Sequence, residues 1–217
     1  MSNATPLDAR ERTQLCLRFE EFGPDAPTLC EGWTTFDLAA HLVVRERNPL
    51  AAPGAALGDR VRPAAAVTEW AMEREKARGY AKVVERVRTG PPPGLFALPG
   101  LGERMNFIEY LVHHEDVRRA NGMAPRFDVD DVQDRAWRYL GPAARLLIRG
   151  VPKGVGLELV RPTGEVRRVR RGERTASVTG EPVELVLWTY GRRAAAQITI
   201  DGDHEAVAGL EHARFGI

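Results

Sequence analysis

The hydrophobic pattern of the chain changes near Gly150, and this change limits the fold more than any other feature of the sequence. Before Gly150, apolar residues recur at steps of three and four, which is the spacing of helices that bury one face. After it, short runs alternate between apolar and polar residues and are separated by glycine-bearing turns, as in the strands of a small sheet. We therefore predict an α+β protein with a helical bundle over residues 1–150 and a small α+β domain over residues 151–217.

The first part is expected to contain five helices joined by short connections, which is typical of a bundle. The pattern places them at about 5–22, 34–47, 65–87, 102–120 and 129–148. The second helix has the clearest start, because Thr34 and Asp37 have the spacing of a capping box. A stretch rich in proline, glycine and alanine, Pro49 to Pro63, is expected to form a loop after it.

The second part is expected to mix strands and helices. Strands are predicted at 156–161, 165–171, 174–179 and 196–200, and helices at 183–190 and 204–213. Pro162-Thr163-Gly164 is expected to turn the first two strands into a hairpin.

Charge and cysteine content exclude several classes of protein. The 31 basic and 30 acidic side chains give a net charge of +1, unlike the strongly basic surface of a general nucleic-acid binder. No signal sequence is visible, and no apolar run approaches the roughly 18 residues that span a bilayer. Cys16 and Cys30 are too few for a disulfide framework and are expected to be idle thiols. We predict a cytoplasmic protein without nucleic-acid or membrane partners.

Three side chains in the helical part suggest a metal site. Glu109 and His113 are four residues apart, so they share one helix face, and His41 lies within another helix. Two imidazoles and one carboxylate are the ligand set of a catalytic zinc ion, although the same set can hold iron, manganese or nickel. His114 points about 100° away from His113 on a helix, which favours His113 as the ligand. From spacing alone, ordinary core or surface histidines remain the alternative.

Two aspartates are candidates for the outer shell of this site. Asp116 and Asp37 each lie within one helical turn of a histidine and can accept its second ring N–H. For Asp37, capping of the helix is an equally good explanation, and Asp116 can instead pair with Arg118 or Arg119.

Two segments resemble the mycothiol-dependent maleylpyruvate isomerase family, a DinB-like group. The segment Leu29 to Leu42, LCEGWTTFDLAAHL, resembles the family's GWT-x-x-DL-x-x-HL pattern, and Glu109 to Arg119 resembles its E-x-x-x-H-x-x-D helix. The resemblance implies a DinB-like helical bundle that binds zinc through His41, Glu109 and His113. Residues 178–180, 185–192 and 200–203 are similar to the small α+β domain, like that of sterol carrier proteins, that many members append.

The resemblance also implies a reaction. In this family the metal activates the thiolate of mycothiol, which adds to an electrophile; in the isomerase, addition to the double bond of maleylpyruvate permits rotation and then elimination. The family uses an arginine of the C-terminal domain at the active site, and the matching candidate here is Arg192, with Arg193 second. Because residues 41–47 are similar to a branch of actinobacterial metal-binding proteins, we expect an isomerase or an S-transferase acting on a small electrophile.

Other readings of the sequence stay open. The chain can instead be a non-enzymatic binder of a small molecule or lipid with a structural metal, and a homodimer is one option for its assembly. The basic run Arg167 to Arg174 is expected to be a solvated surface, with steering of an anionic thiol or substrate as the alternative.

Overall fold

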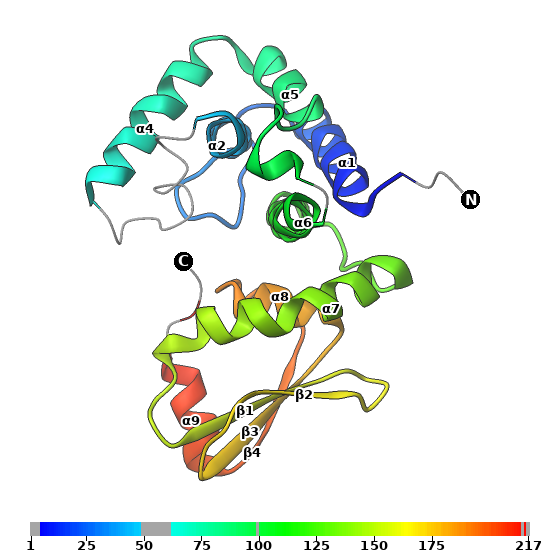
Figure 1. Cartoon of the computed structure of the whole chain (residues 1–217), viewed down its shortest axis with the longest axis vertical. Coiled ribbons are helices and arrows are strands. Elements are labelled where there is room, and N and C mark those ends of the chain that lie inside the picture. Colours follow the sequence, from blue (N-terminus) through cyan, green and yellow to red (C-terminus); the bar gives the residue numbers. More distant parts are fainter. Residues whose placement is uncertain (1–4, 49–61, 99, 214, 216–217) are drawn as a thin grey trace. The chain divides into compact units, whose positions relative to one another are not determined.

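The structure is a computed structural model that describes residues 5–48, 62–98, 100–213 and 215 (Figure 1). It has the predicted α+β composition, with helices in the first part of the chain and a four-stranded sheet in the second. The chain separates into two compact units, Met1–Pro125 and Arg126–Ile217. Most of the loop predicted over 49–63 lies outside the described residues.

The first unit is a helical bundle. Its α-helices are α1 (Leu7–Phe22), α2 (Thr35–Arg47), α4 (Arg62–Lys76), α5 (Tyr80–Arg88) and α6 (Leu101–Ala120), with a short 3₁₀ turn, η2 (Leu95–Ala97). Helix α1 packs on α6, and α2 packs on α4 and α5. The single helix predicted over 65–87 is in fact two helices. It is interrupted before Tyr80, where Gly79 has a φ of 87°, a backbone conformation outside the helical range.

Helix α2 lies in the interior of this unit. Ten of its residues are buried, namely Thr35, Leu38, Ala39, Ala40, His41, Leu42, Val43, Val44, Arg45 and Glu46. Leu38 and Leu42 pack in the same apolar cluster as Phe19 of α1 and Val84 of α5. A helix buried on most faces must find partners for the polar groups that it carries inside, because an unpaired buried charge is costly.

The predicted capping box at the start of α2 is present. Thr34 Oγ1 accepts from the backbone N–H of Asp37, and Asp37 Oδ2 accepts from the backbone N–H of Thr34 at 2.9 Å. Lys76 Nζ lies 2.8 Å from the other carboxylate oxygen of Asp37. Asp37 therefore caps the helix rather than orienting His41. Burial opposes its ionisation, but the bonds from Lys76 and Thr34 outweigh burial and lower its pKa.

Replacing Asp37 with alanine should lower the free energy of unfolding at neutral pH by about 1 kcal/mol, since a cap of this kind is lost. A carboxylate with a lowered pKa contributes stability above its unfolded pKa of about 3.9 and loses it as the pH falls. The difference from wild type should therefore shrink in acid, as measured by urea unfolding at neutral and acidic pH. Glu31→Ala, at an exposed acid in the preceding loop, is the control. A loss that does not change with pH would contradict the prediction.

The second unit is built on a sheet with the strand order β2-β1-β3-β4. The strands are β1 (Val155–Val160), β2 (Val166–Arg170), β3 (Arg174–Thr179) and β4 (Thr199–Gly202), and the helices are α7 (Asp130–Leu147), η3 (Ile148–Gly150), α8 (Pro182–Thr189) and α9 (His204–His212). The predicted β1–β2 hairpin is present, β1 and β3 are parallel, and β3 and β4 are antiparallel. The last strand begins three residues later than predicted. It includes Asp201 and Gly202, which were expected to turn, because they pair with Ser177 and Ala176 of β3.

Helix α7 packs against α8 and β2 and belongs to the second unit, although its sequence pattern grouped it with the bundle. Trp137 and Leu140 are buried on its inner face. The side chain of Gln133 accepts a hydrogen bond from the backbone N–H of Val183, at the start of α8, at 2.9 Å. An amphipathic pattern shows that one face is buried but not which element covers it, so the pattern alone could not place this helix.

The basic run on β2 and β3 makes contacts within its own unit. Arg167 lies over the ring of Trp137, with its Cζ 4.5 Å from the ring centroid. Arg168 Nε lies 2.8 Å from Glu158, and Arg174 pairs with Glu205. Arg168, Arg171 and Arg174 are nevertheless exposed, as expected for a solvated surface.

None of the helices among the described residues combines the length and the apolar character that a bilayer crossing requires.

Candidate metal centre

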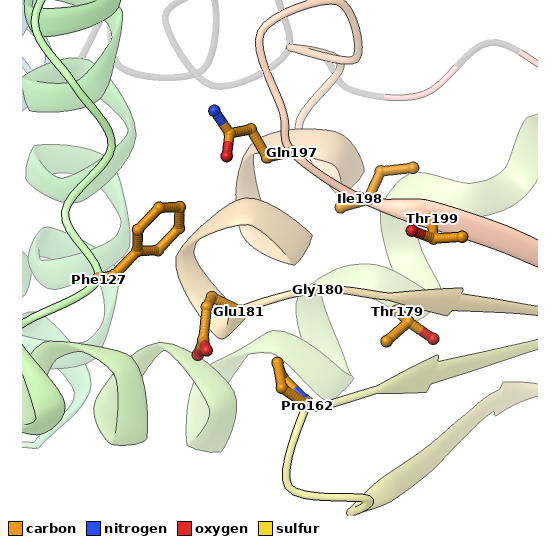
Figure 2. A pocket seen from close by; sticks show the side chains of 8 residues that line it. All are labelled: Phe127, Pro162, Thr179, Gly180, Glu181, Gln197, Ile198 and Thr199. Atoms are coloured by element: carbon orange, nitrogen blue, oxygen red, sulfur yellow. The ribbon is translucent and has the colours of Figure 1, made fainter.

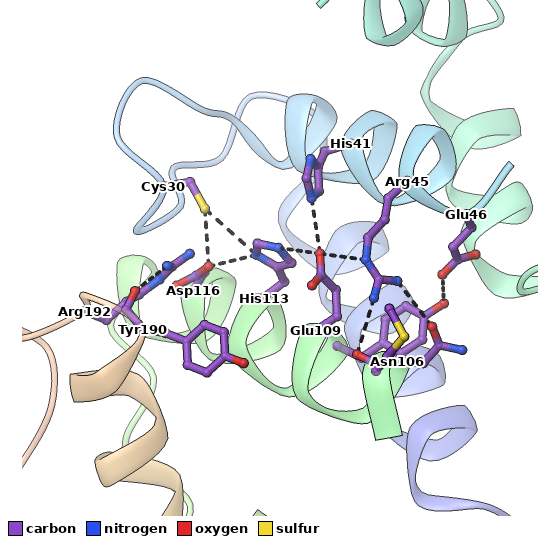
Figure 3. Close-up of polar contacts among 12 residues, drawn as sticks. Cys30, His41, Arg45, Glu46, Asn106, Glu109, His113, Asp116, Tyr190 and Arg192 are labelled. Atoms are coloured by element: carbon purple, nitrogen blue, oxygen red, sulfur yellow. Dashed lines mark hydrogen bonds and ion pairs between the residues drawn. The ribbon is translucent and has the colours of Figure 1, made fainter. Parts of the chain in front are cut away.

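His41, Glu109 and His113 converge in the first unit (Figure 3). His41 comes from α2, and the other two come from one face of α6. The Nε2 atoms of His41 and His113 lie 3.2 Å and 3.4 Å from the same oxygen, Oε1 of Glu109. The potential ligand atoms of the three residues all lie within 4.8 Å of one another. The sequence prediction that these three side chains lie together is therefore met by the geometry.

The spacing fits a first-row divalent ion. Zinc binds imidazole nitrogen and carboxylate oxygen at about 2.0–2.2 Å, so tetrahedral donors lie about 3.3–3.6 Å apart. The two nitrogen–oxygen distances to Glu109 are close to this value. Two imidazoles and a carboxylate leave coordination positions for an exogenous ligand, which distinguishes such a set from a closed structural zinc site.

Asp116 supports His113 from the opposite side of the imidazole ring. Asp116 is fully buried, and its Oδ2 lies 2.9 Å from His113 Nδ1. Nδ1–H donates to this carboxylate, so when the imidazole becomes neutral its lone pair is on Nε2, which faces Glu109. This is the carboxylate–histidine arrangement that orients metal-binding imidazoles. Of the two aspartates that the sequence offered as outer-shell partners, only Asp116 makes the contact.

The charges of the three donors differ. Burial lowers the pKa of His41 despite the neighbouring Glu109, so His41 is held neutral, as a ligand must be. Burial opposes the ionisation of Glu109, but Arg45 and the two histidines outweigh it and hold its pKa well below the usual range. Burial alone would lower the pKa of His113, yet hydrogen bonds with Asp116, Cys30 and Glu109 raise it well above its ordinary value.

His41 has a different environment from His113. It is 5% exposed, and its ring centroid lies 5.0 Å from that of Trp33. Its Nδ1 is buried and has no hydrogen-bond partner in the described part of the chain. Its orientation is therefore set by packing in α2, by Trp33 and by the contact of Nε2 with Glu109, whereas Nδ1 has no carboxylate beside it of the kind that Asp116 provides for His113.

Cys30 lies beside the site, which the sequence analysis did not anticipate. Its Sγ is 3.3 Å from Asp116 Oδ2 and 3.9 Å from His113 Nδ1. These three residues also have the donor types of a metal site. However, His113 Nδ1 and Asp116 Oδ2 are joined by a hydrogen bond of 2.9 Å. We therefore regard Asp116 and Cys30 as neighbours that surround the site formed by His41, Glu109 and His113, and not as a second metal site. The only sequence signal was the place of Cys30 inside the segment Leu29 to Leu42. Cys16 is buried instead, and burial raises its pKa to about 12, as expected for an idle thiol.

The remaining histidines lie outside the group. His114 is 2% exposed and its Nδ1 lies 2.9 Å from Glu11 of α1, so it takes part in packing between α1 and α6. His204 and His212 are exposed on α9.

Arg192, the predicted catalytic arginine, lies in the second unit just after α8. It is half-buried, and its Nη1 donates to the carbonyl oxygen of Tyr190 at 2.7 Å (Figure 3). Its catalytic role stays a prediction. Arg193, the second choice, lies over the rings of Trp188 and Phe215 and donates to the carbonyl oxygen of Ala213. Arg193 is therefore engaged in packing.

The second unit also has an open hollow of about 550 Å³ (Figure 2). It is lined by Phe127, Pro162, Thr179, Gly180, Glu181, Gln197, Ile198 and Thr199. A site for a lipid is normally enclosed and predominantly apolar. The mixture of threonine, glutamine and glutamate in this lining does not favour the alternative of a lipid binder.

The fold and the donor set define a class: helical bundles that carry a His–Glu–His constellation on facing helices, followed by a small α+β unit. Residues 8–99 match the family model of the mycothiol maleylpyruvate isomerase N-terminal domain. The match includes His41, whereas Glu109 and His113 lie beyond it. The resemblance found in the sequence is therefore confirmed.

Two solved structures share the fold. A crystal structure of the mycothiol-dependent maleylpyruvate isomerase matches with a TM-score of 0.57 and 18% identity over 90% of each chain. A variant of that isomerase with one histidine changed to alanine matches with a TM-score of 0.56 and 17% identity, again over 90% of each chain. No curated protein matches the sequence.

Proposed function

We propose that the chain binds one divalent metal ion, with zinc the first candidate, through His41, Glu109 and His113. The observation that carries this proposal is the convergence of the three donors, with ligand atoms within 4.8 Å of one another. We propose further that the protein is an isomerase or S-transferase that uses mycothiol or a similar thiol on a small electrophile. The family of residues 8–99 supports the thiol, and the fold shared with the isomerase supports the reaction class.

When bound, a divalent ion at this site supplies the Lewis acidity that deprotonates a coordinated thiol near neutral pH. The protein supplies the rest. Asp116 holds the proton on His113 Nδ1 and so keeps Nε2 available. The burial of His41 keeps its imidazole neutral, and Trp33 covers one side of the ring. Arg45 keeps the Glu109 carboxylate ionised.

In the isomerisation, the thiolate would add to the double bond of an unsaturated acid, the resulting single bond would rotate, and elimination would return the thiol. An acidic substrate needs a cationic anchor, and arginine suits carboxylates because its planar fork offers two parallel N–H donors. We assign this role to Arg192.

The test is metal analysis of the purified protein, followed by assays of thiol-dependent turnover with mycothiol and candidate electrophiles, maleylpyruvate among them. We expect about one equivalent of metal per chain. Removal of the metal with a chelator should abolish turnover, and zinc should restore it. Full turnover by metal-free protein would refute the proposal.

A further inference from the structure

Helix α2 carries a buried guanidinium four residues after His41. Arg45 is 6% exposed, and the four-residue spacing places it on the same helix face as His41. An arginine at this depth is stable only when its charge and its N–H groups are matched by neighbours. The mechanism proposed above uses only its effect on the ionisation of Glu109.

Among the described residues, the contacts of this guanidinium lead to α6 and to η2, and those with Glu109 and Asn106 can be followed in Figure 3. Nε lies 3.3 Å from Glu109 Oε1, Nη1 donates to Asn106 Oδ1 at 3.2 Å, and Nη2 donates to the Met105 carbonyl at 3.4 Å. The flat face of the guanidinium lies over Phe96, with Cζ 4.4 Å from the ring centroid.

Asn106 is itself fixed. It is 1% exposed, and its Nδ2 donates to the carbonyl oxygen of Phe96 at 2.8 Å. Its Oδ1 is therefore held toward Arg45, and the ring of Phe96 lies over the same guanidinium. The guanidinium thus has a single orientation, with Nε directed at Glu109.

The oxygen that Arg45 contacts is the one that also faces the two histidines. Oε1 of Glu109 lies within 3.4 Å of His41 Nε2, His113 Nε2 and Arg45 Nε. Without this contact, the Glu109 side chain would populate several rotamers, most of them directed away from the histidines.

We propose that Arg45 is a positioning residue, which holds the Glu109 carboxylate between the two histidines and fixes the spacing of α2 and α6. This inference rests on the proposed metal site. Arg45 acts through Glu109 and through the separation of the two helices, and its fork geometry is essential to both. A lysine at this position keeps the charge but cannot make the three contacts at once.

The test compares Arg45→Lys and Arg45→Met with Arg47→Met as a matched control. Arg47 lies two residues further along α2, and its guanidinium donates to Thr89 and to the carbonyl oxygens of Arg86 and Gly90, away from the donors. Zinc affinity is measured on the full chain by competition with a chromophoric chelator, and the geometry of the centre is measured from the visible spectrum of the cobalt-loaded protein.

We expect both Arg45 variants to bind zinc about 10- to 100-fold more weakly than wild type, as is typical when an outer-shell partner is lost. The cobalt spectrum should change in both, while Arg47→Met keeps the wild-type affinity and spectrum even if its melting temperature falls. Lysine should not rescue, because the charge alone does not orient the carboxylate. Asn106→Ala keeps the positive charge of Arg45 but removes one of its hydrogen-bond partners, so it should also weaken zinc binding. This variant provides the test if Arg45→Met does not fold.

The outcomes separate this inference from the proposed function. If the wild-type protein binds no stoichiometric metal, the metal site itself is refuted. If wild type binds zinc but the Arg45 and Asn106 variants bind it as tightly, the positioning role is overturned. Tighter binding by Arg45→Met would also overturn it, since the guanidinium would then act only by repelling the cation.

Discussion

Replacing His41 with alanine should remove stoichiometric metal from the purified protein and abolish any metal-dependent turnover. Loss of an outer-shell partner weakens metal binding by about 10- to 100-fold, and loss of one of three protein ligands should weaken it by more. His41 is the only one of the three donors supplied by α2, so its loss leaves the Glu109–His113 pair of α6 as the remaining ligands. Metal content and chelator competition measure the effect directly.

A matched control comes from the neighbouring buried histidine. His114→Gln keeps a side chain that can bond to Glu11, and it should retain metal with wild-type affinity. Circular dichroism of metal-free protein checks that both variants fold. Retention of metal by His41→Ala, or its loss in His114→Gln, would show that the donors have been wrongly assigned.

The second large effect is a pH dependence of metal affinity. In the metal-free protein, hydrogen bonds raise the pKa of His113 well above its ordinary value, so the imidazole is protonated near neutral pH. A ligand nitrogen must be deprotonated, and binding therefore releases a proton. Affinity should rise with pH by about tenfold per unit below the pKa of His113 and level off above it.

Zinc affinity measured at several values between about pH 6 and 8 would show this slope, and calorimetry in buffers of different ionisation enthalpy would count the released proton. Asp116→Asn removes the carboxylate that raises the pKa of His113. In this variant, the pH range over which zinc affinity rises should therefore shift to lower pH. An affinity that stays constant over this range would mean that His113 is already neutral before the metal binds.

Much of the first unit could be predicted from the sequence because its signals are local. The capping box at Thr34 depends on residues three apart, and the shared face of Glu109 and His113 follows from helix geometry. The meeting of α2 with α6 is not local. It was expected from the resemblance of two segments to one family, and the spacing of the donors could not have established it alone.

The errors arose where packing or pairing decides the outcome. Gly79 divides a stretch whose apolar pattern is continuous, and the place of α7 depends on Gln133 and Trp137 meeting the second unit. Cys30 and Arg45 were missed as neighbours of the site for a similar reason. The side chain of each contacts residues at least 51 positions away, and no periodicity within one helix reports such a contact.

The interior position of α2 has a consequence for the choice of metal. A helix with apolar neighbours on most sides can neither rotate nor slide without exposing those side chains, so the scaffold dictates where its imidazole stands. At the proposed site, ions that accept a compact arrangement of nitrogen and oxygen donors would then be favoured. Calcium, which requires six to eight oxygen ligands at longer distances, would be disfavoured by the rigidity of the core.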